Sequence, residues 1–497
     1  MAYAAPARHG WQVRQQADGS TIEVQQMGDE FYHFWHTRDG KIAQETADGV
    51  FRVTDEPLPT PAQIDARRAE ARSKRAPQAV GTVYLPPRGV VIIAGYTDVP
   101  VMASSTQAAF DSLMNYPGYA YNGATGSVRD YFIAQSDSQY MPVFDVFGPV
   151  TLPRNRAYYG AHSGGKEDAN VAQMIVDACQ AVDDQVDFSL YDADNNGRVD
   201  FVYVIYAGVG ENDYDGEEEA IWAHCYTVYD KNCVLDGKRL DYYVCGGEVD
   251  GVTLDRAGIG TGCHEFGHLL GMPDYYSTGP SAANIICEWS AMDYGMYNND
   301  ANTPPNYSIF DKQFMGWTSV EELAVDSQAN IMLTTNYADG YKMQVGGATY
   351  YIENRQKAGW DIGLPGSGML LWQVKYDQSA WNSNRVNYTN TDPRYSIISA
   401  KSGLMTNGNQ VWSTDADPFP GSEKVTSWTT YEGFALTEVA EANGVVRFKF
   451  NGGCSGCETG LEDIQRGHAE STKEIRDGRL VILRNGMYFD AMGKKIQ

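Results

Sequence analysis

The stretch His-Glu-Phe-Gly-His-Leu-Leu-Gly-Met-Pro-Asp, residues 264–274, carries the most informative pattern of this chain. On a helix, positions four apart share a face, so His264 and His268 can present two imidazoles to one metal ion. Zinc prefers such nitrogen ligands in a tetrahedral arrangement. Glu265 follows directly, and its carboxylate can take a proton from water at the metal without being a ligand. The stretch therefore predicts a zinc site on a helix, with Glu265 as general base.

The residues after this helix supply a turn and a carboxylate. Gly271 is placed to end the helix with a left-handed backbone, which residues with a Cβ resist. The chain can then turn back, and Asp274 becomes a candidate third zinc ligand, with water in the fourth, open position. Structural zinc sites usually have four protein ligands and no adjacent base. Glu265 therefore favours a zinc endopeptidase over the alternative, a secreted metal-binding adhesin or binding protein without catalytic activity.

The part of the chain before this motif contains two regions with different sequence patterns. Residues 11–53 contain β-rich runs and turn signals, and Thr60-Pro61 opens a helix that continues into a basic stretch. Continuous apolar runs at residues 89–95 and 201–206 then predict buried strands, with helical patterns between them. We therefore expect an N-terminal segment with a basic linker at 1–76, and an α/β (α+β) domain with a mixed sheet and the active-site helix at 77–320.

The remaining residues are mostly β in character. Short runs such as Met369 to Val374 are separated by Gly, Asn and Asp, which predicts a β-rich domain at residues 321–452. Residues 453–497 begin with a Gly- and Cys-containing linker. The apolar runs around Asn485-Gly486 then predict a tail hairpin.

Composition restricts the class of protein. The 497 residues carry a formal charge of −26, which argues against nucleic acid as a partner. No run approaches the roughly 20 apolar residues that span a bilayer. The first residues lack a charged segment followed by an apolar one, so they do not form a signal peptide. Either the protein is cytosolic, or the sequence begins after the cleavage site. Because of the features described below, we expect the second, a secreted, extracellular protein whose signal peptide is already removed. Eight cysteines allow 105 disulfide pairings, and unpaired buried cysteines are the alternative.

A second metal site is predicted at residues 192–200. Asp192, Asp194, Asn196 and Asp200 place oxygen atoms at alternate positions, and Gly197 lies where an EF-hand-like loop turns sharply. The bidentate Glu at the twelfth position is missing, so a complete EF-hand is excluded. We expect a calcium loop here, and the alternative is an Asp- and Asn-rich turn before the next strand.

Downstream, residues 289–295 read Trp-Ser-Ala-Met-Asp-Tyr-Gly, which resembles the Met-turn of metzincin peptidases. By that resemblance Met292 forms a hydrophobic base under the metal, and Tyr294 ligates zinc or stabilises the oxyanion. Together with the helix motif, the chain resembles the immune inhibitor A family of metzincin-related zinc metallopeptidases, whose third ligand is commonly Asp. The family often has a second acidic residue three positions later, where this chain has Ser277.

The resemblance also implies a metzincin-like catalytic domain and a latent precursor. The first 75 residues resemble the family's propeptide, which would act as an internal inhibitor, and proteins or peptides would be the substrates. No cysteine precedes Cys179, so a propeptide cysteine cannot mask the zinc. An Asp, Glu or His from residues 1–75 is the candidate for that role. His224 is expected to be structural rather than a ligand.

This interpretation predicts activation by proteolysis. Cutting within the basic stretch at residues 67–76 is expected to raise peptidase activity, because exposed linkers of this kind are preferred sites of cleavage. Casein hydrolysis before and after a limited digest measures the change. Purified full-length protein that is already maximally active would contradict the prediction of a latent precursor.

Overall fold

The computed structural model describes residues 3–46, 49–73, 83–162, 168–214, 216–278, 286–336, 339–388, 392–401, 413–430 and 433–453, together with the backbone of three C-terminal strands. The cysteine-containing linker at 454–457 and the end of the basic stretch, residues 74–76, lie outside the described residues. Within the described residues, no helix has the length and apolar character needed to cross a membrane.

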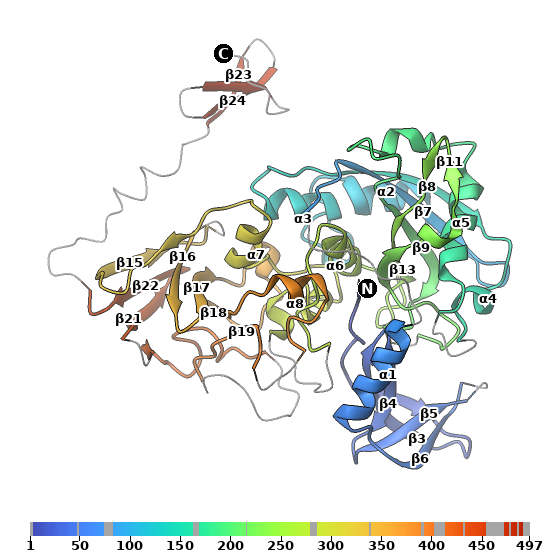
Figure 1. Ribbon diagram of the computed structural model, residues 1–497, viewed down its shortest axis with the longest axis horizontal. Helices are drawn as coiled ribbons and strands as arrows, with labels where there is room; N and C mark the ends of the chain where they lie inside the picture. The colour runs from blue at the N-terminus through green and yellow to red at the C-terminus, as the bar shows by residue number, and fades with distance from the viewer. Residues whose placement is uncertain are drawn as a thin grey trace.

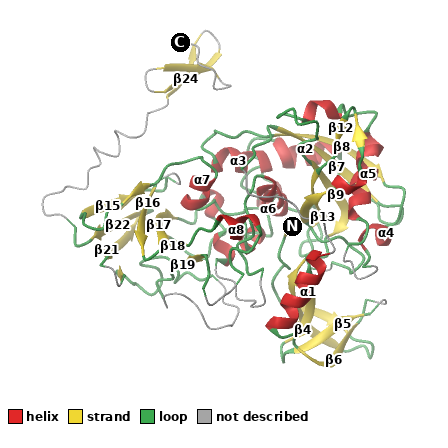
Figure 2. Ribbon diagram, in the orientation of Figure 1, coloured by secondary structure: helices red, strands yellow, loops and turns green. Residues whose placement is uncertain are grey.

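The central part of the chain combines strands and helices, as the alternating apolar runs predict (Figure 2). Its principal elements are β1 (Tyr3–Ala4), β7 (Arg88–Gly95), α2 (Gln107–Asn115), α3 (Val128–Gln135), β8 (Val143–Thr151), α4 (Arg156–Gly160), α5 (Val171–Val182), β9 (Val202–Val209), β10 (His224–Thr227), β11 (Val234–Leu235), β12 (Lys238–Arg239), β13 (Tyr242–Val249), α6 (Gly260–Leu269) and α7 (Ile309–Phe314). Six of the strands form a mixed sheet in the order β1-β10-β13-β9-β7-β8. β8, β7, β9 and β13 are parallel, whereas β10 and β1 are antiparallel to their neighbours.

Both faces of this sheet are buried, which explains the continuous apolar runs in its strands. Along β7, Val91 and Ile93 join a core that includes α2, α3 and Phe266 of α6. Val90 and Ile92 point the other way and pack with α5. The sheet therefore separates two cores, and α6, which carries the predicted metal ligands, covers one face near β13, β10 and β1 (Figure 1).

The N-terminal part is a separate antiparallel sheet with one helix (Figure 1). It contains β2 (Gln12–Gln15), β3 (Thr21–Asp29), β4 (Tyr32–Thr37), β5 (Lys41–Glu45), β6 (Phe51–Pro57) and α1 (Pro61–Ser73). The five strands pair in sequence order, and α1 packs against β4. The first residues are not part of this sheet, because β1 pairs with β10 and forms the edge strand of the central sheet. Tyr3–Ala4 thus belongs to the central sheet, and not to the small N-terminal unit in which the sequence placed it.

The C-terminal part is a β-sandwich. Its elements are β14 (Glu321–Glu322), β15 (Ala329–Leu333), β16 (Gly340–Val345), β17 (Ala348–Arg355), β18 (Gly368–Val374), α8 (Gln378–Asn382), β19 (Tyr395–Ile397), β20 (Trp428–Thr429), β21 (Ala435–Ala442) and β22 (Val445–Phe450). One sheet has the order β14-β16-β17-β18-β19, and the other has the order β15-β22-β21-β20. Leu371 packs between the two sheets, whereas Leu370 and Trp372 face the core of the central part. Strand β18 is therefore buried on both faces and joins the sandwich to the rest of the molecule.

Two further sequence predictions have outcomes here. The tail forms a small sheet of β23 (Thr472–Arg476), β24 (Arg479–Arg484) and β25 (Met487–Asp490), which extends the predicted hairpin by one strand. None of the six cysteines in the described part of the chain forms a disulfide. The alternative of unpaired cysteines therefore describes these six.

Candidate metal centre

Helix α6 lies almost entirely in the interior, and only Thr261 and Leu269 are partly exposed. Its sequence Gly-Thr-Gly-Cys-His-Glu-Phe-Gly-His-Leu includes three glycines, which are tolerated because neighbours approach the helix closely. A Cβ on Gly260 would lie 1.9 Å from the carbonyl oxygen of Met296, and one on Gly267 would lie 2.6 Å from Met292 Sδ. The helix ends at Leu269, and Gly271 follows with φ of +108°, as the sequence predicts. This turn returns the chain toward the helix.

The turn brings three candidate ligand atoms together. His264 Nε2 and His268 Nε2 are 3.1 Å apart, and Asp274 Oδ1 lies 3.3 Å from the first and 3.1 Å from the second. Ligands of a tetrahedral zinc with bonds of about 2.0–2.1 Å lie roughly 3.3 Å from each other. All three side chains are buried, and Asp274 Oδ1 has no hydrogen-bond partner in the described part of the chain. The donor set and its spacing therefore fit one zinc ion.

The two imidazoles are held by backbone carbonyls on their outer sides. His264 Nδ1 lies 2.8 Å from the carbonyl oxygen of Ala291, and His268 Nδ1 lies 2.7 Å from that of Met272. Each Nδ1 must carry the proton to donate to these carbonyls, which leaves the lone pair of each Nε2 directed at the centre. Burial also lowers the pKa of His268 and favours the neutral imidazole that a metal requires.

The third candidate ligand is positioned by the C-terminal part of the molecule. Asn384, which follows α8, donates from Nδ2 to Asp274 Oδ2 over 2.5 Å and accepts the backbone N–H of Asp274 over 2.8 Å. Burial alone would raise the pKa of Asp274, but His268 and His264 reverse this effect and hold the pKa below its usual range. Asp274 is thus an ionised carboxylate with one oxygen fixed and the other directed at the imidazoles.

Glu265 lies beside this centre and contacts the N-terminal segment. Its Oε1 accepts a hydrogen bond of 2.7 Å from the backbone N–H of Ala5, and its Oε2 has no hydrogen-bond partner in the described residues. Burial and the negative charge of Asp274 raise the pKa of Glu265 well above its usual value. The carboxylate is therefore in an environment that favours taking up a proton.

The predicted Met-turn residues lie close to the helix. Met292 is fully buried, and its sulfur packs against Gly267. Tyr294 is 6% exposed, and its ring meets the edge of the His9 ring at 5.1 Å between centroids. Tyr294 also packs with Ala5, so the N-terminal segment covers it.

The predicted calcium loop brings the carboxylates of its three aspartates together. Carboxylate oxygens of Asp192, Asp194 and Asp200 lie within 4.8 Å of one another. Asn196 lies beside them: its Nδ2 donates to Asp194 Oδ2 over 2.9 Å, and its Oδ1 accepts the backbone N–H of Arg198 over 2.9 Å. The ammonium of Lys238 lies 2.5 Å from Asp192 Oδ2 and supplies a positive charge at the same place.

Other functional contacts were not foreseen from the sequence. Asn384 lies 110 residues after Asp274, and no pattern connects the two positions. Ala5 belongs to a short apolar start with no motif. His224 does have the structural role expected of it, because its ring lies between the carbonyl oxygen of Trp222 and the hydroxyl of Tyr243, each at 2.7 Å.

A buried helix with two histidines, an adjacent glutamate and a returning aspartate defines the class of metallopeptidases. Residues 105–319 match the immune inhibitor A peptidase M6 catalytic domain, so this part of the chain is similar to that family. It is 28% identical over 228 residues to immune inhibitor A of Bacillus thuringiensis subsp. alesti, an alignment that covers 39% of this chain and 33% of that protein. It is 26% identical over 245 residues to the pre-pro-metalloprotease PrtV of Vibrio cholerae serotype O1, covering 41% of this chain and 26% of PrtV. The chain thus aligns with about a third or less of each relative's length.

The close contact beneath α6 gives a testable prediction. Gly267→Ala is expected to destabilise the protein by about 1–3 kcal/mol, because the new methyl group would meet Met292, Met272 and Tyr307 together. Gly262→Ala, on the same helix, is the control, since its nearest contact would be 3.3 Å from Tyr203 Oη. Urea unfolding measures both. The double variant with Met292→Ala should cost less than the sum of the single variants, and strictly additive costs would contradict this packing.

Proposed function

We propose that this chain is a secreted zinc endopeptidase that is made in a latent form. The observation that carries the proposal is the spacing of His264 Nε2, His268 Nε2 and Asp274 Oδ1, which are mutually 3.1–3.3 Å apart. Three protein ligands would leave a fourth position for water or substrate, the arrangement of a catalytic zinc site. The match of residues 105–319 to a metallopeptidase catalytic domain supports the same conclusion.

In this proposal each residue has a distinct task. The zinc ion, when bound, polarises a peptide carbonyl and makes water more acidic. Glu265 takes the proton of the attacking water at its carboxylate and later delivers it to the leaving amine. The Tyr294 hydroxyl donates to the developing oxyanion once the N-terminal segment has left. Met292 fills the space beneath α6 and keeps the two histidines in position.

The alternative is a secreted binding protein that keeps the metal only for structure. Glu265 argues against this alternative. A carboxylate buried beside the charge of Asp274 is costly, as its raised pKa shows, and a structural metal site has no use for it. Such costs are typical of residues retained for catalysis.

Latency is supported by the path of the N-terminal segment. Ala5 is fully buried, and its N–H donates a hydrogen bond to the carboxylate of Glu265, the residue assigned as the base. Glu30, in the turn between β3 and β4, is also buried, and its negative charge contributes to the raised pKa of Glu265. With this segment in place His264, Glu265 and His268 have no more than 2% of their surface exposed. A substrate cannot reach them until the segment leaves.

Arg8 anchors this segment to the catalytic part. Its guanidinium contacts Asp250 at 2.6 Å, Asp213 at 3.0 Å and Asp300 at 3.1 Å. Arg8 is buried, and despite the cost of burial the two nearer carboxylates raise its pKa. We assign Arg8 as the charged anchor of the inhibitory segment, because leaving these carboxylates unpaired in the interior is expensive.

Calcium remains a prediction for the loop at residues 192–200. The three clustered carboxylates supply hard oxygen ligands, which favour calcium. The ammonium of Lys238 would have to leave Asp192 for the ion to bind. Stabilisation of the protein by added calcium, lost in Asp194→Asn, tests this assignment.

Exchange of the proposed base separates catalysis from metal binding. Glu265→Gln is expected to retain one zinc at the α6 centre and to lose at least about 1,000-fold in casein hydrolysis, because the amide cannot accept the proton. His268→Ala should lose both the zinc and the activity. Metal analysis and proteolysis, each after activation, provide the two measurements. Full activity of Glu265→Gln would show that another group is the base.

Loss of the Arg8 anchor is expected to weaken latency. Arg8→Met should raise the activity of the uncut protein by about tenfold or more, since a lost buried partner costs about 3–5 kcal/mol and each 1.4 kcal/mol is a factor of ten. Arg38→Met is the matched control, because Arg38 follows β4 of the N-terminal sheet, is exposed and pairs with the exposed Glu23. Unchanged basal activity in a correctly folded Arg8→Met protein would contradict the inhibitory role of this segment.

A further inference from the structure

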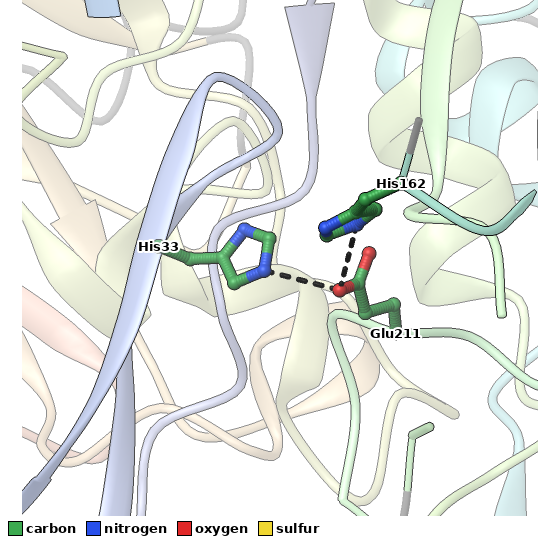
Figure 3. A group of neighbouring side chains, drawn as sticks. All are labelled: His33, His162 and Glu211. Atoms are coloured by element: carbon green, nitrogen blue, oxygen red, sulfur yellow. Dashed lines mark ion pairs between the residues drawn. The ribbon is translucent and has the colours of Figure 1, made fainter. Parts of the chain in front are cut away.

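A second cluster of ligand-type side chains lies where the N-terminal sheet meets the catalytic part. His33 comes from β4, His162 follows α4, and Glu211 follows β9. Figure 3 shows both imidazoles directed at the same carboxylate oxygen. His33 Nε2 lies 3.0 Å and His162 Nε2 lies 3.4 Å from Glu211 Oε1. One ligand atom from each of the three residues lies within 4.8 Å of the other two.

The orientation of the two rings matches that of ligand histidines. Each ring directs Nε2 toward the carboxylate and Nδ1 toward another oxygen. His33 Nδ1 lies 3.3 Å from the carbonyl oxygen of Asp29, and His162 Nδ1 lies 3.8 Å from Glu218 Oε1. His33 shares with His264 and His268 an Nδ1 within hydrogen-bonding distance of a backbone carbonyl oxygen, whereas His162 Nδ1 lies beyond that distance from Glu218. Oxygen partners of this kind fix the tautomer and raise the basicity of a metal ligand.

The carboxylate of Glu211 has an oxygen atom that could bind a metal ion. It is 3% exposed, and its Oε2 has no hydrogen-bond partner among the residues that the structure describes. A buried carboxylate oxygen without a partner is costly, and such charges are normally paired or bound to a metal. Burial would raise the pKa of Glu211, but the two histidines reverse this effect and lower the pKa, so the carboxylate is ionised.

We propose that His33, His162 and Glu211 bind a zinc ion that joins the N-terminal sheet to the catalytic part. Two imidazoles and one carboxylate form a donor set that suits zinc, whereas calcium and magnesium prefer oxygen ligands alone. The ion is separate from the α6 centre. It reaches the cluster through a cavity of about 760 Å³, which is lined by all three residues and by Glu218. A water molecule completes the coordination.

The position of this ion connects it to the inhibitory segment. The His33 ring stacks on Trp222, with centroids 4.6 Å apart and planes inclined by 28°. Trp222 Nε1 donates a hydrogen bond of 2.7 Å to the carbonyl oxygen of Ala5, the residue whose N–H contacts Glu265. An ion that holds His33 therefore also holds the ring that supports Ala5. Because the ion binds only the docked arrangement, it stabilises that arrangement by linkage.

The test removes the α6 centre first, so that only the new site can bind metal. Full-length protein with His264→Ala and His268→Ala is stripped of metal, dialysed against micromolar zinc at pH 7.5 and analysed for bound zinc. We expect about one zinc per chain. Adding Glu211→Gln or His162→Gln should abolish it, whereas His36→Gln on the same β4 strand should leave it unchanged. Cobalt in place of zinc should give a tetrahedral visible spectrum that disappears in the same variants.

The outcomes distinguish this proposal from the peptidase assignment, which it does not need. No zinc in the double variant, or zinc that survives both Glu211→Gln and His162→Gln, would overturn it. In that case the cluster is a metal-free imidazolium–carboxylate pair. Circular dichroism shows whether each variant is folded. Because Glu211→Gln and His162→Gln lie beside different elements, zinc binding can be measured in one of these variants if the other does not fold. Zinc should also raise the melting temperature of the double variant and not that of its Glu211→Gln derivative.

Discussion

The return of Asp274 to the two histidines of α6 is the constraint on which the catalytic part is built. Burying three polar side chains in an apolar interior is tolerated only if each ring and carboxylate has a hydrogen-bond partner that fixes it. The carbonyls of Ala291 and Met272 hold the imidazoles, and Asn384 holds the carboxylate. Small shifts of any of these elements would change distances that are now 3.1–3.3 Å. This requirement explains why the surroundings of α6 are closely packed and why Gly267 has no space for a side chain.

Because Asp274 must be fixed, the C-terminal β-sandwich contributes to the metal centre. Strand β18 is buried on both faces, and the segment after it carries Asn384 to Asp274. Within the sandwich's first sheet, Arg355 is fully buried and binds Asp361 at 2.6 Å and the carbonyl oxygen of Asn306 at 3.0 Å. These contacts tie the sandwich to the segment between the Met-turn and α7. The sandwich therefore positions the third candidate ligand rather than simply following the catalytic part in sequence.

The N-terminal segment contacts the central sheet and α6 directly. Strand β1 completes the edge of the central sheet beside β10, and Ala5 then reaches Glu265. Arg8 fixes the segment by charge, and Trp222 fixes it by a hydrogen bond. His33 of the second cluster stacks on Trp222, so this aromatic ring lies between the proposed second ion and Ala5, which contacts Glu265. In the proposed latent form, inhibition and the docking of the N-terminal sheet therefore depend on one connected set of contacts.

The sequence by itself determined the local features. It located α6, the glycine turn at Gly271 and the strands β7 and β9, because helical spacing, positive φ and continuous apolar runs are properties of neighbouring residues. Only the tertiary structure decided which distant residues meet these features. Asn384 at Asp274, Ala5 at Glu265, and His33 and His162 at Glu211 come from segments separated by about 50 to 260 residues. Their convergence depends on how sheets and loops pack, which leaves no periodic trace in the sequence.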